Sequence, residues 1–585
     1  MKFLNNINLP RDVKKLNNDE LNILSGEIRQ ALLQRVSDIG GHVGPNLGFV
    51  EATIALHYVF NSPIDKIVYD VSHQCYPHKI LTGRKYGFIN PEKYNEISGY
   101  TNPNESEHDM FRVGHTSTSI SLACGLAKAR DLKGEKENII AVIGDGSLSG
   151  GEAYEGLNNA AVLNSNIIIV VNDNEMSIAV NQGGLYKNLQ LLRETNGQAE
   201  NNIFKALGFE YFYLDEGNNI EKLIETFNKV KDVSKPIVVH IHTEKGKGLE
   251  YAEEEKEKWH FKSAFDIETG KLKAKGSSKE NYRQLIVNYL SNRIGQDKKL
   301  VAITAGTPEA VGFSQEFRDM AGNQFLDVGI AEEHAIAMAS GIAKNGGRPV
   351  FCVLSSFIQR TYDQLSQDLC LNNNPAVIIT IRTGISSGDV THLGCFDIPM
   401  MSNIPNLVYL APTNKEECIA MLEWSLNQTR YPVAIRTNLD EAIETGIKVE
   451  DDFGILNKYK VEEKGKDVAI IGLGNFYWLG SKVKEELKQH GINATLINPR
   501  YITGIDEQLL EQLKNDHKLV VTLEDGVLDG GFGEKITRFY GTSDMKVLNY
   551  GAKKEFVDRV PVQDLYTKYR LRKDLIVEDI LNNIH

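Results

Sequence analysis

The sequence predicts an α/β protein made of three doubly wound domains. The chain has 585 residues, of which 41% are hydrophobic, and at roughly 100–200 residues per domain this length accommodates about three or four domains. Short runs of β-branched residues recur, each followed by a turn signal and then a helical pattern. Such runs are typical of parallel strands buried on both faces, with helices covering the sheet.

The first domain is expected over residues 1–275. Its strands are predicted from three apolar runs, at 139–143, 167–171 and 237–241. The pattern breaks over 252–280, which is first charged and then rich in Gly, Ser and Lys. That composition predicts a linker.

Two further α/β series follow, which predict domains over residues 276–450 and 451–585. A softer break near 451–466 separates them. The expected strands are 300–304, 349–354, 376–381, 407–410 and 433–435 in the second domain, and 468–471, 494–497 and 520–523 in the third.

The charge balance and the cysteines narrow the classes of function. A net charge of -13 argues against nucleic-acid binding, and it means that anionic ligands need local cations. The six cysteines form no C-x-x-C pair, so no zinc or redox motif is present. The N-terminus lacks the apolar core of a signal peptide, and no run is long enough to cross a bilayer. We therefore expect a cytoplasmic protein that binds no membrane.

Two strand ends carry the residues of a metal site. Asp145 lies in a Gly-Asp-Gly turn after one strand, and Asn174 follows the next strand 29 positions later. Mg²⁺ prefers hard oxygen ligands, and glycines let a phosphate approach the backbone. Gly-Asp-Gly alone is a common turn, but the combination predicts a site for a metal and a diphosphate.

This pattern resembles the thiamine-diphosphate motif of the transketolase superfamily. Longer stretches, which together run nearly end to end, resemble the 1-deoxy-D-xylulose-5-phosphate synthase family. They are 40–48 (GGHVGPNLG), 70–84 (DVSHQCYPHKILTGR), 114–121 (GHTSTSIS), 172–178 (NDNEMSI), 327–335 (DVGIAEEHA), 355–364 (SSFIQRTYDQ) and 524–533 (EDGVLDGGFG). The resemblance implies a transketolase-like fold, with two thiamine-diphosphate-binding domains and a transketolase C-terminal domain, and a homodimer.

The resemblance also implies thiamine diphosphate and Mg²⁺ as cofactors. Asp145, Asn174 and the Met176 carbonyl would hold the metal. Glu332 would hydrogen-bond the cofactor pyrimidine and so activate it, although a Glu at this position is ordinarily a helix-start residue. The implied cofactor-binding residues are His73, Gly114, His115, Thr116, Gly146, Ser147, Asn174, Leu249 and Glu332.

Proton transfer and acceptor binding are assigned in the same way. Imidazoles suit proton transfer near neutral pH, and the implied catalytic residues besides Glu332 are His42, His73, His260, His392 and Asp389. His78 is expected to pack or cap. The acceptor and its phosphate would be bound by Arg360, Arg382 and Tyr362, because guanidinium groups match phosphate geometry. Surface salt bridging is the alternative for the arginines.

The departures from the family pattern cluster where the acceptor binds. Ile381 replaces a family Asp, Leu439 replaces a family phosphate-binding Arg, and the spacing from Asp389 to His392 is one residue short. Leu249 stands where the family has Tyr, and the segment 177–204 is tens of residues shorter than usual. A lost Arg–phosphate contact of roughly 1.5–3 kcal/mol would weaken acceptor binding by one or two orders of magnitude unless another cation substitutes.

The predicted reaction is therefore the decarboxylative condensation of pyruvate with D-glyceraldehyde 3-phosphate, giving 1-deoxy-D-xylulose 5-phosphate and CO₂ for isoprenoid precursor synthesis. Two alternatives stay open. One is a related synthase or transketolase-like enzyme with a different aldehyde acceptor. The other is a non-catalytic binding protein, which the retained Asp145, Asn174 and Glu332 disfavour.

Overall fold

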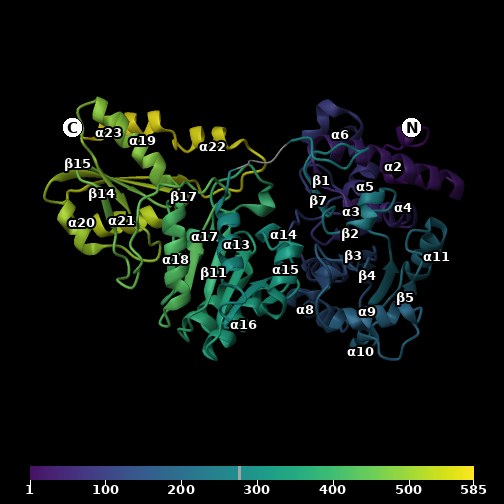
Figure 1. The fold of residues 1–585 in the computed structure, drawn as a ribbon. Coiled ribbons are helices and arrows are strands. Elements are labelled where there is room, and N and C mark those ends of the chain that lie inside the picture. The colour runs from purple at the N-terminus through teal and green to yellow at the C-terminus, as the bar shows by residue number, and fades with distance from the viewer. Residues whose placement is uncertain (275–278, 585) are drawn as a thin grey trace. The chain divides into compact units, whose positions relative to one another are not determined.

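The computed structural model describes residues 1–274 and 279–584 and divides the chain into two compact units (Figure 1). The first unit is Met1–Gly276 with Gly329–Ala331, and the second is Ser277–Val328 with Glu332–His585. The predicted boundary at 275/276 lies outside the described residues.

The first unit contains a five-stranded parallel sheet in the order β2-β3-β4-β6-β5. Its strands are β2 (Lys66–Tyr69), β3 (Ile139–Gly144), β4 (Ile168–Asp173), β5 (Glu210–Leu214) and β6 (Ile237–His242). The three predicted strands are confirmed as β3, β4 and β6, the interior of the sheet. The crossovers between parallel strands place helices on both faces, as Figure 1 shows.

The helices and the minor strands of this unit are α1 (Pro10–Val13), α2 (Asn18–Ile39), β1 (Gly41–His42), α3 (Gly44–Gly48), α4 (Val50–Val59), α5 (Tyr76–Lys79), α6 (Tyr86–Ile89), α7 (Ser119–Lys133), α8 (Gly151–Ala160), α9 (Gly184–Glu194), α10 (Ile203–Leu207), α11 (Ile220–Val230), α12 (Glu250–Glu254) and β7 (Phe261–Lys262). Successive residues of a strand face opposite sides of the sheet. Ile140 and Val142 of β3 therefore join one core with α2, α4 and α11, while Ile139 and Ala141 join another with α7, α8 and α9. These two cores confirm the doubly wound prediction.

The predicted linker is wrong for the described residues 252–274. Strand β7 pairs antiparallel with β1, with Gly41 opposite Lys262 and His42 opposite Phe261. Trp259 and Phe265 are buried in the first core, at 2% and 0% exposure. The charged composition predicted a linker, but two buried aromatic side chains are enough to attach the segment to the domain. Residues 275–278, also part of the predicted linker, lie outside the described residues.

The second unit contains two sheets. The parallel one has the order β12-β13-β11-β10-β8-β9, and the mixed one has the order β14-β16-β15-β17-β18, with β14 antiparallel. The strands are β8 (Leu300–Thr304), β9 (Phe325–Asp327), β10 (Arg348–Leu354), β11 (Val377–Ile381), β12 (Val408–Leu410), β13 (Val433–Arg436), β14 (Lys460–Glu463), β15 (Asp467–Gly472), β16 (Thr495–Asn498), β17 (His517–Val527) and β18 (Lys546–Ala552). Every strand predicted for the second and third domains is present.

Helices flank both of these sheets (Figure 1). They are α13 (Tyr282–Arg293), α14 (Pro308–Val311), α15 (Gln315–Ala321), α16 (Glu332–Lys344), α17 (Asp397–Met401), α18 (Lys415–Asn427), α19 (Phe476–Gln489), α20 (Glu507–Leu513), α21 (Phe532–Tyr540), α22 (Val562–Lys568) and α23 (Lys573–Asn583). Within the described ranges, no helix is both long and apolar enough to cross a membrane.

Candidate active site

The predicted metal residues lie together at the carboxyl ends of β3 and β4. The Asp145 amide donates to the Asn172 carbonyl at 3.1 Å, which joins the two strand ends. Asp145 is 1% exposed and Asn174 is 8% exposed. The Asn174 Oδ1 atom is buried and has no hydrogen-bond partner among the described residues. Burial and the charge of Asp173 raise the pKa of Asp145, so a cation here would relieve an unfavourable carboxylate.

The turn that carries these residues is linked to neighbouring elements by Glu175. This residue lies between Asn174 and Met176 with φ of 66°, in the left-handed region. Its carboxylate lies 3.2 Å from His242 Nε2 and 3.2 Å from an Arg193 nitrogen. Such strain persists only where the surroundings fix it, and these two partners supply that constraint.

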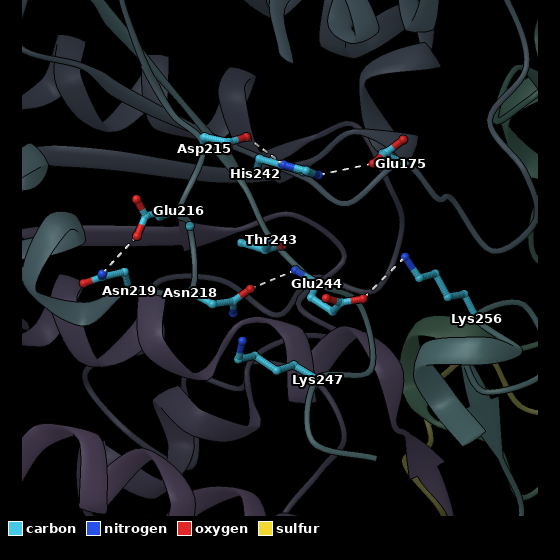
Figure 2. Close-up of a pocket in the computed structure, with 11 residues that line it drawn as sticks. Glu175, Asp215, Glu216, Asn218, Asn219, His242, Thr243, Glu244, Lys247 and Lys256 are labelled. Carbon is cyan, nitrogen blue, oxygen red and sulfur yellow. Dashed lines mark hydrogen bonds and ion pairs between the residues drawn. The ribbon is translucent and has the colours of Figure 1, made fainter. Parts of the chain in front are cut away.

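Figure 2 shows the cavity next to this turn, where His242 links Glu175 to Asp215. The cavity, of about 460 Å³, is lined by Glu175, Asp215, Glu216, Gly217, Asn218, Asn219, His242, Thr243, Glu244, Lys247 and Lys256. None of the predicted site residues lines it. Its carboxylates are paired with neighbouring side chains and brace the strand ends of β4, β5 and β6.

Three of the predicted histidines meet in one cluster. The ring centroids are 5.5 Å apart for His42 and His73, 5.6 Å for His42 and His260, and 5.3 Å for His73 and His260. The Asn46 amide donates to the carbonyls of His42 at 2.9 Å and His73 at 2.6 Å. Burial lowers the pKa of His73 to about 3 and that of His260 well below its usual value. Burial therefore favours the neutral form of both rings at pH 7.

Lys245 is a site residue that the sequence reasoning missed. It is 1% exposed, and its Nζ donates to the Ser177 carbonyl at 2.5 Å. Burial lowers its pKa to about 7, against the opposing effect of Asp145. Its position in a Lys-Gly-x-Gly stretch after β6 was the available signal.

The glycine-rich stretches pack closely around the same turn. A Cβ on Gly146 would lie 2.8 Å from Ser177, so only glycine fits there. Ser117 Oγ donates to the Ser147 carbonyl at 2.8 Å. This bond brings the loop of Gly114, His115 and Thr116 next to Gly146 and Ser147.

Two other residues of this unit that the sequence singled out, Leu249 and His78, are buried. Leu249 is 8% exposed and lies in the first core. His78 is fully buried, 2.8 Å from Asp109 and 2.9 Å from His57, in agreement with the expectation that it packs.

In the second unit, Glu332 is the first residue of α16. It is 3% exposed, and its Oε2 atom is buried with no hydrogen-bond partner among the described residues. Burial raises its pKa to about 7, although the Arg360 guanidinium opposes the shift. A buried carboxyl oxygen without a partner is suited to a polar ligand atom. The helix-start explanation alone leaves this oxygen unexplained.

The loop after β11 carries Asp389 and His392. Asp389 accepts from Thr391 Oγ1 at 2.8 Å, and that hydroxyl lies 2.8 Å from His392 Nδ1. The His392 ring lies 5.6 Å from Phe357, edge to face. The short spacing thus still connects Asp389 to His392, through one hydroxyl.

The predicted acceptor residues differ in their surroundings. Arg382 is exposed and has φ of 61° directly after β11. Tyr362 is 43% exposed and its hydroxyl donates to Asn403 at 2.9 Å. Leu439 is also 43% exposed, whereas Arg436, three residues earlier, is buried between Asp397 and Asp525. Arg436 is therefore fully used in ion pairs, and Leu439 offers no charge.

Comparison with known proteins assigns the chain. The family model described as 1-deoxy-D-xylulose-5-phosphate synthase matches residues 4–202 and 195–243. The transketolase pyrimidine-binding domain matches 278–442, and the transketolase C-terminal domain matches 457–576. The 1-deoxy-D-xylulose-5-phosphate synthase of Caldanaerobacter subterraneus subsp. tengcongensis is 40% identical over 618 residues, covering 99% of both chains. The chain belongs to the 1-deoxy-D-xylulose-5-phosphate synthase family.

Other members of this family are similar to the same degree. The Clostridium beijerinckii synthase is 40% identical over 98% of each chain. Among solved structures, the transketolase of Campylobacter jejuni is 16% identical, covering 97% of this chain and 100% of that one, with a TM-score of 0.45. As a member of the synthase family, the chain is a thiamine-diphosphate-dependent transferase.

Proposed function

We propose that this chain condenses pyruvate with D-glyceraldehyde 3-phosphate to give 1-deoxy-D-xylulose 5-phosphate and CO₂. The observation that carries the proposal is the identity of 40% along 99% of a synthase of that name. The buried, unpartnered oxygen of Glu332 supports it, since a pseudoenzyme has no need to retain such an energetically costly group.

The residues of the first unit suit a metal and a diphosphate. Asp145, Asn174 and the Met176 carbonyl would hold Mg²⁺, and Gly114, His115, Thr116, Gly146 and Ser147 would surround the diphosphate. Thiamine diphosphate, when bound, supplies the electron sink for decarboxylation and carbon–carbon bond formation. The buried unpaired oxygen of Asn174 supports the metal assignment.

The protein's own groups would then handle protons and orientation. Glu332, with a pKa of about 7, can hold or release a proton at the pyrimidine. His42, His73 and His260 would orient the substrate as hydrogen-bonding groups, since burial keeps His73 and His260 neutral. His392, linked to Asp389 through Thr391, is proposed for proton transfer. Arg360, Arg382 and Tyr362 would bind the acceptor phosphate.

A different aldehyde acceptor is the second candidate, and the observation that favours it concerns Leu439 and Arg436. The first has no charge, and the second is held by two buried carboxylates. We further propose a cytoplasmic homodimer, and the six free thiols support a reducing compartment.

A product assay tests the proposal. The purified protein with thiamine diphosphate and Mg²⁺ is given pyruvate and one aldehyde from a panel of phosphorylated and free aldoses, and CO₂ and products are measured by mass spectrometry. We expect 1-deoxy-D-xylulose 5-phosphate from glyceraldehyde 3-phosphate and none from the Glu332→Ala variant. If condensation occurs only with another aldehyde, that aldehyde takes the place of glyceraldehyde 3-phosphate as the proposed acceptor. The absence of any CO₂ release would overturn the enzymatic proposal.

A further inference from the structure

The segment that follows Met176 folds back onto the metal-binding turn. An isolated antiparallel bridge pairs Met176 with Val180 and reverses the chain. Ser177 packs tightly on Gly146, because a Cβ atom added to Gly146 would lie 2.8 Å from the Ser177 side chain. Helix α9 begins shortly afterwards, at Gly184. The short segment from 177 to 194 is thus an ordered part of the site.

Two side chains of this segment contact Asp145 directly. Asn181 Nδ2 donates to Asp145 Oδ2 at 2.6 Å. The Tyr186 hydroxyl donates to the carbonyls of Asp145 at 3.2 Å and Gly146 at 3.3 Å. The Asn181 bond fixes the carboxylate of Asp145, and the two Tyr186 bonds fix the backbone of Asp145 and Gly146. The Asn181 Oδ1 atom is itself buried and has no hydrogen-bond partner among the described residues.

We propose that Asn181 and Tyr186 are positioning residues that hold the Asp145 carboxylate in the orientation that binds the divalent cation. The inference rests on the proposed Mg²⁺ site. A carboxylate with one oxygen engaged by an amide has a fixed plane, and its other oxygen would be the metal ligand. Partners that orient a ligand typically change metal affinity by about 10–100-fold, because a preorganised ligand loses less freedom on binding.

The test measures metal affinity apart from turnover. Mn²⁺ is titrated into the protein with saturating thiamine diphosphate, and free Mn²⁺ is followed by electron paramagnetic resonance. We expect about tenfold weaker Mn²⁺ binding for Asn181→Leu and a smaller, few-fold loss for Tyr186→Phe. The wild-type kcat should return at saturating Mg²⁺, since neither residue takes part in the chemistry. Gln182→Ala and Lys187→Ala, exposed neighbours on the same segment, should bind Mn²⁺ as the wild type does.

The outcomes distinguish the positioning role of Asn181 and Tyr186 from the proposed Mg²⁺ site on which that role rests. If the wild type does not bind Mn²⁺, the proposed metal site is wrong. If the wild type binds but Asn181→Leu and Tyr186→Phe bind within twofold of it, the positioning role alone is wrong. Thermal melting without metal identifies a misfolded Asn181→Leu protein, and in that case Tyr186→Phe, which removes a single oxygen, decides the question.

Discussion

Arg193 on helix α9 donates to Asp173 Oδ2 at 2.6 Å, and this ion pair fastens the helix to the end of strand β4. Asp173 is fully buried, and it also lies 2.9 Å from His240 Nε2. The residue next to it is Asn174, so the pair fixes the backbone from which a proposed metal ligand projects.

Replacing Arg193 with Leu should destabilise the first unit. Removal of one partner from a buried ion pair costs about 3–5 kcal/mol, and the remaining bond to His240 should keep the loss near the lower end. Chemical unfolding followed by far-UV circular dichroism measures it. Lys187→Leu, an exposed position on the same helix, serves as the control. A loss below about 1 kcal/mol for Arg193→Leu would contradict the prediction.

Glu332→Gln should remove a pH dependence of stability. Burial raises the pKa of Glu332 from 4.5 to about 7, so between these values the folded state holds a proton that the unfolded state has lost. Stability from this group is therefore complete below pH 4.5 and falls as the pH rises towards 7, by about 3 kcal/mol. Relative to the wild type, Glu332→Gln should gain about that much between pH 4.5 and 8 in urea unfolding without cofactor. Glu333→Gln is the matched control, and an equal gain there would refute the assignment.

Arg436→Leu should be severely destabilising, by about 3–5 kcal/mol, because it leaves Asp397 and Asp525 buried without their shared cation. Arg382→Leu, at the end of the neighbouring strand but exposed, should change stability by less than about 0.5 kcal/mol. Differential thermal unfolding of the two variants compares them directly. Similar melting temperatures would show that the ion-pair cluster contributes little.

Two glycine-to-alanine changes should have opposite effects. A Cβ on Gly146 meets Ser177 at 2.8 Å, whereas a Cβ on Gly125, within α7, meets nothing within 4 Å. Gly146→Ala should therefore destabilise by about 1–3 kcal/mol, and Gly125→Ala should stabilise by about 0.5–1 kcal/mol. The midpoints of urea unfolding, compared at an unchanged m-value, measure both effects. An unchanged stability of Gly146→Ala would show that the loop of Ser177 moves to accommodate the added methyl group.

Leu439→Arg should improve use of a phosphorylated acceptor. The position is 43% exposed, so a new guanidinium needs no burial, and one charge-assisted contact corresponds to about tenfold in affinity. We expect the KM for glyceraldehyde 3-phosphate to fall about tenfold while the KM for pyruvate is unchanged. Leu439→Gln, which is polar but uncharged, should leave both values near those of the wild type. An unchanged acceptor KM would mean that Leu439 does not face the phosphate.

The interior strands could be read from the sequence, but most edge strands could not. Strands β3, β4 and β6 are almost wholly buried, so their residues form apolar runs. The unpredicted strands of the three large sheets, β2, β5, β9, β14 and β18, all lie at sheet edges. Strand β5, for example, has no buried residue, and its aromatic sequence EYFYL differs from the short β-branched runs by which the buried interior strands were recognised.

The sequence by itself determined the α/β class, the family and the chemical types at the site, since strand ends with Asp145, Asn174 and Glu332 are local patterns. Only the tertiary structure decided which groups surround them. Asn181, Tyr186 and Arg193 reach the turn of the proposed metal site from a segment whose own pattern indicates nothing unusual. The lowered pKa of His73 and the raised pKa of Glu332 could not be predicted from the sequence either. Burial sets both, and burial is a property of the packed fold, which residue spacing does not encode.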